Sequence, residues 1–149
     1  MLGAKRRWIV ATVSLSIGWL LFHGYVARAL WARGDEFLRR GDPAAAQPYY
    51  RRAIAIDPNC EDAVDRLLLA AVELRTAPDL YLAIAAGDRY LKRHPDAADI
   101  RLDRAMALLA ARRGHAAAGD FRWLAAHAHD ARFEKLAARA AAMGDKFHS

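Results

Sequence analysis

The chain has 149 residues, of which 55% are hydrophobic and 27% are charged, and its formal net charge is +6. This apolar content excludes an intrinsically disordered chain, because disordered chains have too few apolar side chains to offset the entropy lost on folding. The positive charge would suit an anionic partner, but acids are interleaved with the arginines and no zinc-finger or RNA-binding signature is present, which disfavours nucleic acid. Abundant alanine and few β-branched residues predict an all-α fold.

The first predicted element is a transmembrane helix over residues 8–27, preceded by a basic segment over residues 1–7. His23 is its only clearly polar side chain. The run is just long enough for the ~30 Å hydrocarbon core at ~1.5 Å per residue. Trp8 and Tyr25 lie near its two edges, where aromatic side chains anchor a helix at the membrane interface.

The predicted span carries a helix-packing pair and a site that resembles a cleavage signal. Ser14 and Gly18 are four residues apart, so they share one helix face and would let another transmembrane helix approach closely. A cleaved signal peptide is the alternative, because the basic start, the apolar stretch and the small-residue site Ala27-Arg28-Ala29 also fit that description. Cleavage there would cut into the first repeat helix, and we therefore favour an uncleaved signal anchor.

The charges that flank the span predict its orientation. Lys5, Arg6 and Arg7 favour a cytoplasmic N-terminus under the positive-inside rule, although Arg28 and Arg33 on the other side reduce the asymmetry. A sizeable domain that follows a span crosses the membrane largely regardless of its charge. We therefore expect a single-pass protein of a bacterial inner membrane, with its domain in the periplasm.

Residues 27–131 are predicted to form three helical hairpins. Breakers separate the helical segments at Gly41-Asp42-Pro43, Asp57-Pro58-Asn59, Ala77-Pro78-Asp79, His94-Pro95-Asp96 and Gly114-His115. Such regular punctuation is typical of stacked helical hairpins. A last helix over residues 131–143, with Asp130 as its N-cap and Gly144 as its end, would cap the third hairpin and leave residues 144–149 as a tail.

The first hairpin carries a characteristic set of small and aromatic residues. They are Gly34 and Phe37 on its first helix, Gly41-Asp42 at the turn, Ala46, Tyr50 and Ala53 on its second helix, and Pro58 after it. This set closely resembles the tetratricopeptide repeat, although Leu30 and Arg33 depart from its usual tryptophan and leucine. Small residues let the helices approach, and Phe37 and Tyr50 would fill the resulting space. The resemblance implies a short α-solenoid of tetratricopeptide-like hairpins.

The second and third hairpins match the repeat less closely. The residues that fall in register in the second are Ala71, Leu74, Ala83, Tyr90 and Pro95, and those in the third are Ala107, Gly114, Gly119, Trp123 and Ala126. Gly87 stands where an aromatic residue is expected, which predicts a looser contact in the second hairpin.

No motif in the sequence indicates catalysis, a cofactor or a metal. Phosphate-binding loops, dinucleotide glycine patterns and His-Glu-x-x-His are absent. His127 and His129 are two residues apart and would point to nearly opposite sides of a helix, so we do not expect them to share a metal ion. Cys60 lies in a predicted loop without a neighbouring base, which disfavours it as a nucleophile. We therefore expect a protein that is not an enzyme.

The resemblance implies a concave groove, lined by the first helices of the hairpins, in which another protein binds. Its candidate lining residues are Arg39, Asp65, Leu69, Arg75, Arg101, Arg104 and Arg112. The last three follow one another at three- and eight-residue steps and would share one helix face, where they repel one another unless an anionic group lies nearby. Arginine binds carboxylates in a bidentate manner, so a basic groove predicts a protein partner with an acidic segment.

Two functions fit this organisation. The first is a membrane-anchored scaffold or adaptor that holds other proteins during assembly of a bacterial envelope complex. The alternative is a constitutive accessory subunit of a membrane enzyme or of a respiratory or photosynthetic complex, in which the transmembrane helix packs on partner helices. A stoichiometric, salt-resistant complex after detergent extraction would favour the subunit, and a salt-labile, substoichiometric association would favour the adaptor.

Overall fold

The structure, a computed structural model, describes residues 22–128 and 130–146. In this part the chain forms seven helices and no strand, which confirms the all-α prediction. The helices are residues 22–39, Pro43–Ile56 (α2), Glu61–Leu74 (α3), Ala77–Arg93 (α4), Ala98–Ala110 (α5), Gly114–Ala128 (α6) and Ala131–Asp145 (α7).

Most of the predicted transmembrane segment lies outside the described residues. The basic segment 1–7, the packing pair Ser14 and Gly18, and residues 8–21 of the span all precede residue 22. Among the helices of residues 22–128 and 130–146, none has the length and apolar content needed to cross a membrane. Residues 22–27 are the part of the predicted span that the structure describes, and they belong to a helix that continues without a break to residue 39.

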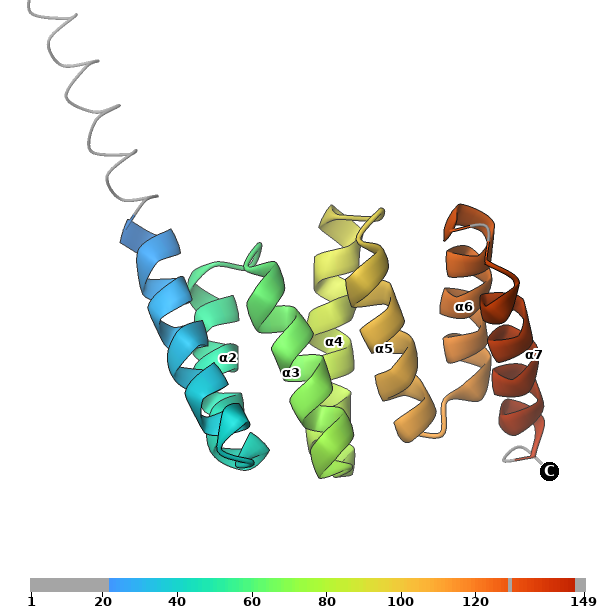
Figure 1. Cartoon of the computed structure of the whole chain (residues 1–149), viewed down its shortest axis with the longest axis horizontal. Helices are drawn as coiled ribbons and strands as arrows, with labels where there is room; N and C mark the ends of the chain where they lie inside the picture. Colours follow the sequence, from blue (N-terminus) through green and yellow to red (C-terminus); the bar gives the residue numbers. More distant parts are fainter. Residues whose placement is uncertain (1–21, 129, 147–149) are drawn as a thin grey trace, which may run out of the picture.

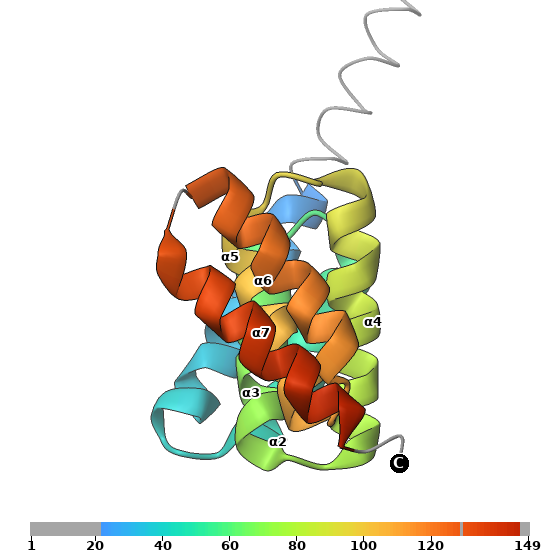
Figure 2. The same cartoon turned by 90° about the vertical axis from the view of Figure 1, so that its right-hand side faces the viewer.

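The helices pair into antiparallel hairpins that stand in a row, and α7 covers the last hairpin (Figure 1). The pairs are residues 22–39 with α2, α3 with α4, and α5 with α6. Helix α3 packs on α2, α4 and α5, whereas no comparable contact joins α2 to α4 within the described helices. In the turned view α4 lies along one edge of the molecule, and α6 and α7 face the viewer (Figure 2). This is the arrangement of a short helical solenoid, in which each hairpin buries its apolar face against its neighbours.

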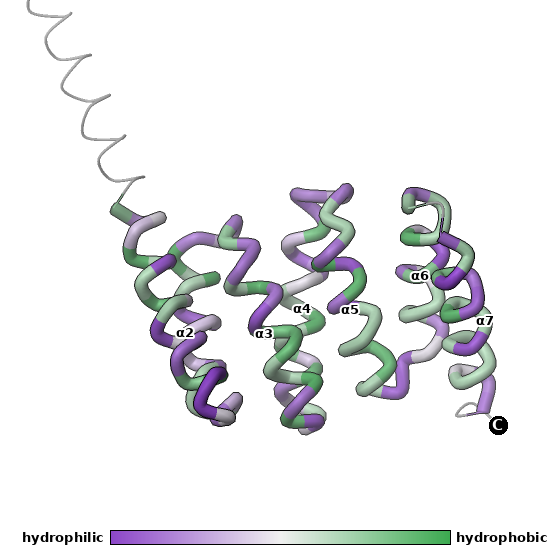
Figure 3. Tube along the Cα trace, viewed as in Figure 1, coloured by the Kyte–Doolittle hydropathy of each residue, from purple (hydrophilic) through white to green (hydrophobic). Residues whose placement is uncertain are grey.

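The helix starts follow from capping residues in the sequence. Asp42 accepts a hydrogen bond from the backbone N–H of Ala45 at 2.9 Å, directly after Gly41, whose φ of 77° is readily available only to glycine. Thr76 caps α4 and Asp130 caps α7 in the same manner, which confirms the predicted N-cap of the last helix. Figure 3 shows the connection from α5 to α6 as hydrophilic, as expected for an exposed turn.

The end of the last helix differs from the prediction. Helix α7 continues through Gly144 to Asp145, and Gly144 is buried in its last turn. The reason is tertiary packing, because the start of α6 approaches α7 here. A Cβ atom added to Gly144 would lie 2.7 Å from Cδ2 of His115, and one added to Gly114 would lie 2.5 Å from the backbone nitrogen of Gly144. The glycine therefore allows a helix contact instead of ending the helix.

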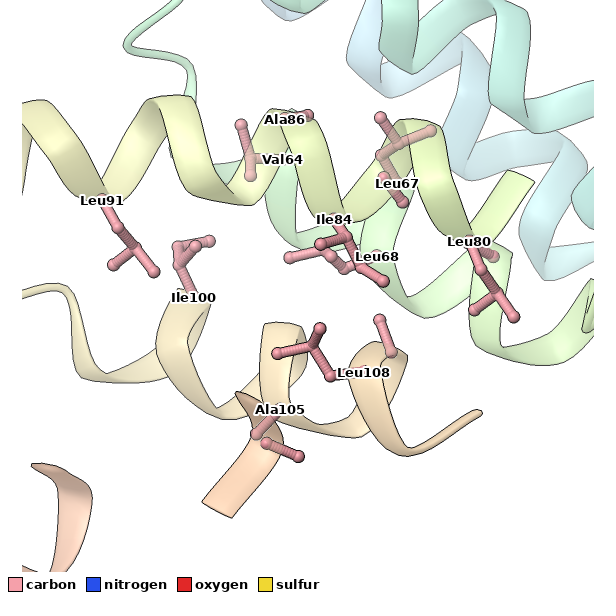
Figure 4. Close-up of a cluster of buried hydrophobic side chains, with 14 of the residues drawn as sticks. Val64, Leu67, Leu68, Leu80, Ile84, Ala86, Leu91, Ile100, Ala105 and Leu108 are labelled. Atoms are coloured by element: carbon pink, nitrogen blue, oxygen red, sulfur yellow. The ribbon is translucent and has the colours of Figure 1, made fainter. Parts of the chain in front are cut away.

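The centre of the core lies between α3, α4 and α5. Figure 4 shows that the side chains of Leu68, Ile84, Leu108 and Ile100 meet there from all three helices. None of the four is more than 4% exposed, and burial of such side chains stabilises a fold by about 1.5–3 kcal/mol each. This core fixes the second hairpin against the third.

The first hairpin packs as its small and aromatic residues predict. Tyr50 is fully buried, and a Cβ atom added to Gly34 would lie 2.7 Å from its Cε1 atom, so the ring rests directly on the glycine. Phe37 is only partly buried and stacks on Tyr49, with 5.4 Å between the ring centroids. Tyr50 is therefore the core aromatic of this hairpin, and Phe37 lies at its edge.

The predicted register is correct in the second hairpin and for Ala107 and Gly114 of the third, but it is wrong along the rest of α6. Ala71, Ala83 and Tyr90 are buried as expected. In α6, however, Gly119 and Ala126 are exposed and Trp123 is only partly buried. The buried apolar positions of α6 are instead Ala117, Ala118, Phe121 and Leu124. The match was placed two residues too far along the chain, because an alanine-rich helix offers a small residue at almost every step.

Other side chains fill the space beside Gly87, whereas the missing aromatic residue predicted looser packing there. A Cβ atom there would lie 3.4 Å from Cδ of Arg104 and 3.5 Å from Cδ1 of Leu68. The aliphatic stem of Arg104 thus occupies the space of the usual ring, as long basic side chains often cover apolar surface.

Candidate functional site

Two of the predicted groove arginines belong to an internal ion-pair network. Arg104 donates from Nε to Oδ2 of Asp120 at 2.9 Å and from Nη2 to Oδ1 at 2.5 Å, and from Nη1 to Asp88 at 2.6 Å. Arg101 lies 3.5 Å from the same Asp120 carboxylate and 4.1 Å from the ring centroid of Trp123. Asp120 is 3% exposed. The network links α4, α5 and α6 through these side-chain contacts.

Nearby acids therefore offset the repulsion between Arg101 and Arg104, and the prediction that Arg112 shares their helix face is wrong. Asp120 and Asp88 already compensate the charge of Arg104, and Asp120 that of Arg101. Arg112 lies beyond the last residue of α5, where its φ of 58° places it in a left-handed turn. The sequence spacing assumed a helix that extended at least two residues further than α5 does.

Helix α5 also carries an acid, directly before Arg104 in the sequence. Asp103 on α5 forms a side-chain hydrogen bond with Asp65 on α3, one of the predicted groove residues. Arg66, next to Asp65, lies 3.4 Å from the carboxylate of Asp35 on the first helix. Asp35, Asp65 and Asp103 thus form an acidic row across the first helices of all three hairpins, and Arg39 and Arg66 pair with it.

Replacing Asp103 by asparagine is expected to remove a pH dependence of stability. Burial, and then the neighbouring Asp65 carboxylate, raise the pKa of Asp103 to about 8 from 3.8. Between these values the folded state keeps a proton that the unfolded state has lost, so stability falls as the pH rises. Asp103 is only partly buried, so solvent screening keeps the slope below the limit of about 1.4 kcal/mol per pH unit. Asparagine donates a similar hydrogen bond without a charge.

Urea unfolding at pH 5, 7 and 9 measures this effect. We expect the Asp103→Asn variant to gain stability over the parent chain at pH 9 and to match it more closely at pH 5. Equal pH slopes for the two chains would show that the two carboxyl groups do not share a proton.

The remaining predicted groove residues occupy different surroundings. Arg39 is exposed and donates from Nε to Asp35 at 3.3 Å, one turn earlier on the same helix. Leu69 is partly buried on α3. Arg75 follows the last residue of α3 and, like Arg112, has a left-handed backbone, with a φ of 54°. Non-glycine residues rarely adopt this conformation, and such strain is often found at functional sites.

Arg75 and Arg112 come together at one pocket. It has a volume of about 380 Å³ and lies where the turn from α3 to α4 meets the turn from α5 to α6. Its lining residues are Arg75, Ala77, Leu80, Tyr81, Ile84, Ala110, Ala111, Arg112 and Arg113. We call this site the arginine pocket. It combines an apolar floor with three arginine residues and no lining aspartate or glutamate, which suits an acidic ligand that also carries apolar groups.

Tyr81 and Arg113 in this pocket were not anticipated from the sequence. Tyr81 is 70% exposed, although it is a large aromatic side chain. The sequence does indicate that Tyr81 is exposed, because it falls outside the small and apolar positions of α4 that face the core. Asp120 could have been found in the same way, since an acid between Ala117 and Phe121 on an apolar face requires a basic partner.

Elsewhere in the described residues, the side chains that could act as a nucleophile or bind a metal make structural contacts. Burial raises the pKa of the Cys60 thiol, which lowers its reactivity at neutral pH. His127 stacks on Trp123 with 3.8 Å between the ring centroids and bonds to the backbone carbonyl of that residue. No group of three or more His, Cys, Asp or Glu side chains that could hold a metal ion occurs within residues 22–128 and 130–146.

The comparison with known families gives one match. Residues 27–72 match the family model described as tetratricopeptide repeat. The matched stretch comprises most of the first helix, all of α2 and most of α3, which is the part of the chain with the closest residue pattern. Neither the curated proteins nor the solved structures give a match to the chain.

Proposed function

We propose that this chain, whose residues 27–72 match the tetratricopeptide-repeat family, is a membrane-anchored scaffold that holds an acidic segment of a partner protein. Tetratricopeptide repeats suggest protein–protein interaction, generally without catalysis. The arginine pocket carries the finer proposal, since three arginines surround an apolar floor there without a lining acid. The place of action that we propose is the periplasmic side of a bacterial inner membrane, in the assembly of an envelope complex.

Charge reversal in the arginine pocket tests the proposed binding. We expect Arg75→Glu with Arg113→Glu to weaken partner binding by about 2 kcal/mol or more, as when a buried charge loses its mate. The matched control is Arg122→Glu with Arg139→Glu, which reverses two exposed charges on α6 and α7. The measurement is crosslinking from membranes, with mass spectrometry to identify the captured protein segment.

The control variant should capture the same acidic segment as the parent chain. If the pocket variant keeps its helical content and still captures the segment fully, the arginine pocket is not the binding site. A captured segment without acidic residues would contradict the proposed chemistry of the partner.

Two observations support retention of the N-terminal anchor. The run of residues 8–27 is long and apolar enough to span a bilayer, and cleavage after Ala29 would cut the helix that ends at residue 39. In addition, Phe22 and Tyr25 are 61% and 73% exposed, as suits aromatic side chains at a membrane interface.

We therefore expect the mature protein to begin near Met1 and to remain in membranes after carbonate extraction. Mass spectrometry of the protein isolated from membranes measures its first residue. A mature start at Leu30 would establish cleavage in place of anchoring.

A further inference from the structure

We propose that the furrow between α2 and α4 is a second docking site, which takes an acidic segment with a large apolar side chain. The site lies between the second helices of two hairpins, away from the first-helix groove and from the arginine pocket. The inference rests on the proposed scaffold function and adds a second surface to it.

The furrow exists because α2 and α4 both pack on α3 rather than on each other. It encloses a volume of about 370 Å³, in the size range of sites that hold small ligands or single anchoring side chains. Leu67 of α3 and Ala86 of α4 line it and are almost completely buried, at 2% and 3% exposed. The other apolar lining residues are Ile54, Ala55, Pro58 and Leu82.

Leu82 is the apolar side chain that an occupant would cover. It is 39% exposed, one of the few large apolar side chains of the described residues left open to solvent. An apolar side chain seated in the furrow would remove this surface from water, which favours binding. The floor therefore favours a ligand with an apolar group over a purely ionic one.

The charged lining residues all carry the same sign. Arg51 comes from α2, and Arg89 and Arg93 come from α4, and no aspartate or glutamate lines the furrow. No ion pair to a carboxylate is present for any of these three arginines within the described residues. This differs from Arg101 and Arg104, whose charges are compensated internally.

Hydrogen bonds hold one end of the furrow in place before any ligand binds. Arg93 donates from Nη2 to the carbonyl oxygen of Pro58 at 2.6 Å, and His94 bonds through Nε2 to Asn59 at 3.1 Å. These contacts tie the loop between α2 and α3 to the end of α4. A guanidinium has five N–H donors, so Arg93 keeps others for a ligand. A site formed in advance loses less ordering entropy on binding.

The occupant that this chemistry selects is a protein segment in which acidic residues flank a leucine or phenylalanine. Guanidinium groups bind carboxylates with paired hydrogen bonds, and the apolar floor takes the side chain between them. An anionic membrane surface would satisfy the arginines but would leave the apolar floor without a matching group.

Fluorescence anisotropy with synthetic peptides tests this inference. The probes are a peptide with glutamates on both sides of a leucine and the same peptide with glutamines. The measurements use the full chain with Arg75→Glu and Arg113→Glu, in which the arginine pocket no longer contributes. We expect the glutamate peptide to bind at least tenfold more tightly than the glutamine peptide.

A matched pair of variants locates the binding. Adding Arg51→Glu and Arg89→Glu should weaken binding of the glutamate peptide at least tenfold. Adding Arg52→Glu and Lys92→Glu, which reverses two exposed charges on the same helices outside the furrow, should change binding less than threefold. Circular dichroism establishes that each variant is folded.

Three results would overturn the inference: equal binding of the two peptides, equal losses in the two variants, or arginine-dependent binding to anionic lipid vesicles in place of the glutamate peptide. Each of them leaves the proposed scaffold function standing, because partner capture through the arginine pocket is measured separately.

Discussion

Replacing Tyr50 by alanine is expected to lower the free energy of unfolding by about 3–5 kcal/mol, the usual cost of emptying an aromatic core site. The ring is fully buried and rests on Gly34, so the first helix has no side chain of its own with which to fill the cavity. Urea unfolding followed by circular dichroism measures the change. The loss should be accompanied by loosening of the first helix against α2.

Replacing Tyr50 by phenylalanine is the matched control for this prediction. The Tyr50 hydroxyl is buried and has no hydrogen-bond partner among the described residues. Removal of an unpaired buried hydroxyl removes a desolvation cost, so the Tyr50→Phe variant should be at least as stable as the parent chain. A loss below about 1 kcal/mol for Tyr50→Ala would contradict the packing described here.

Replacing Asp120 by alanine is expected to cost about 3–5 kcal/mol, because it removes one partner of a buried ion pair and leaves the other uncompensated. Arg104 would lose two of its three hydrogen bonds in the network, and Arg101 would lose its nearest carboxylate. The stem of Arg104 also fills the space beside Gly87, so disorder of this side chain would loosen α4 against α5.

The control for this variant is Asp88→Ala, because Asp88 binds the same guanidinium from a more exposed position. Its side chain is 48% exposed against 4% for Asp120. Exposed ion pairs contribute about 0–1 kcal/mol, so this variant should lose much less stability. Equal losses for the two variants in urea unfolding would show that burial does not govern the network.

The sequence by itself determined the parts of this protein that depend on local chemistry. Aspartate and threonine cap a helix that begins directly after them, as Asp42, Thr76 and Asp130 do here. The starts of these helices are therefore encoded locally. The fit of Gly34 to Tyr50 could be predicted as well, because a glycine and an aromatic residue at this spacing complement each other within one hairpin.

Only the tertiary structure decided which charges face the surface. Arg104 and Asp103 are neighbours in sequence, yet Arg104 binds Asp120 and Asp88 while Asp103 pairs with Asp65. Successive residues of a helix differ by ~100° in direction, and the register of neighbouring hairpins determines which direction is buried. In the alanine-rich third hairpin the spacing of small residues does not specify the register, because such residues are compatible with several packings. The buried ion pairs of Asp120 select one of these packings.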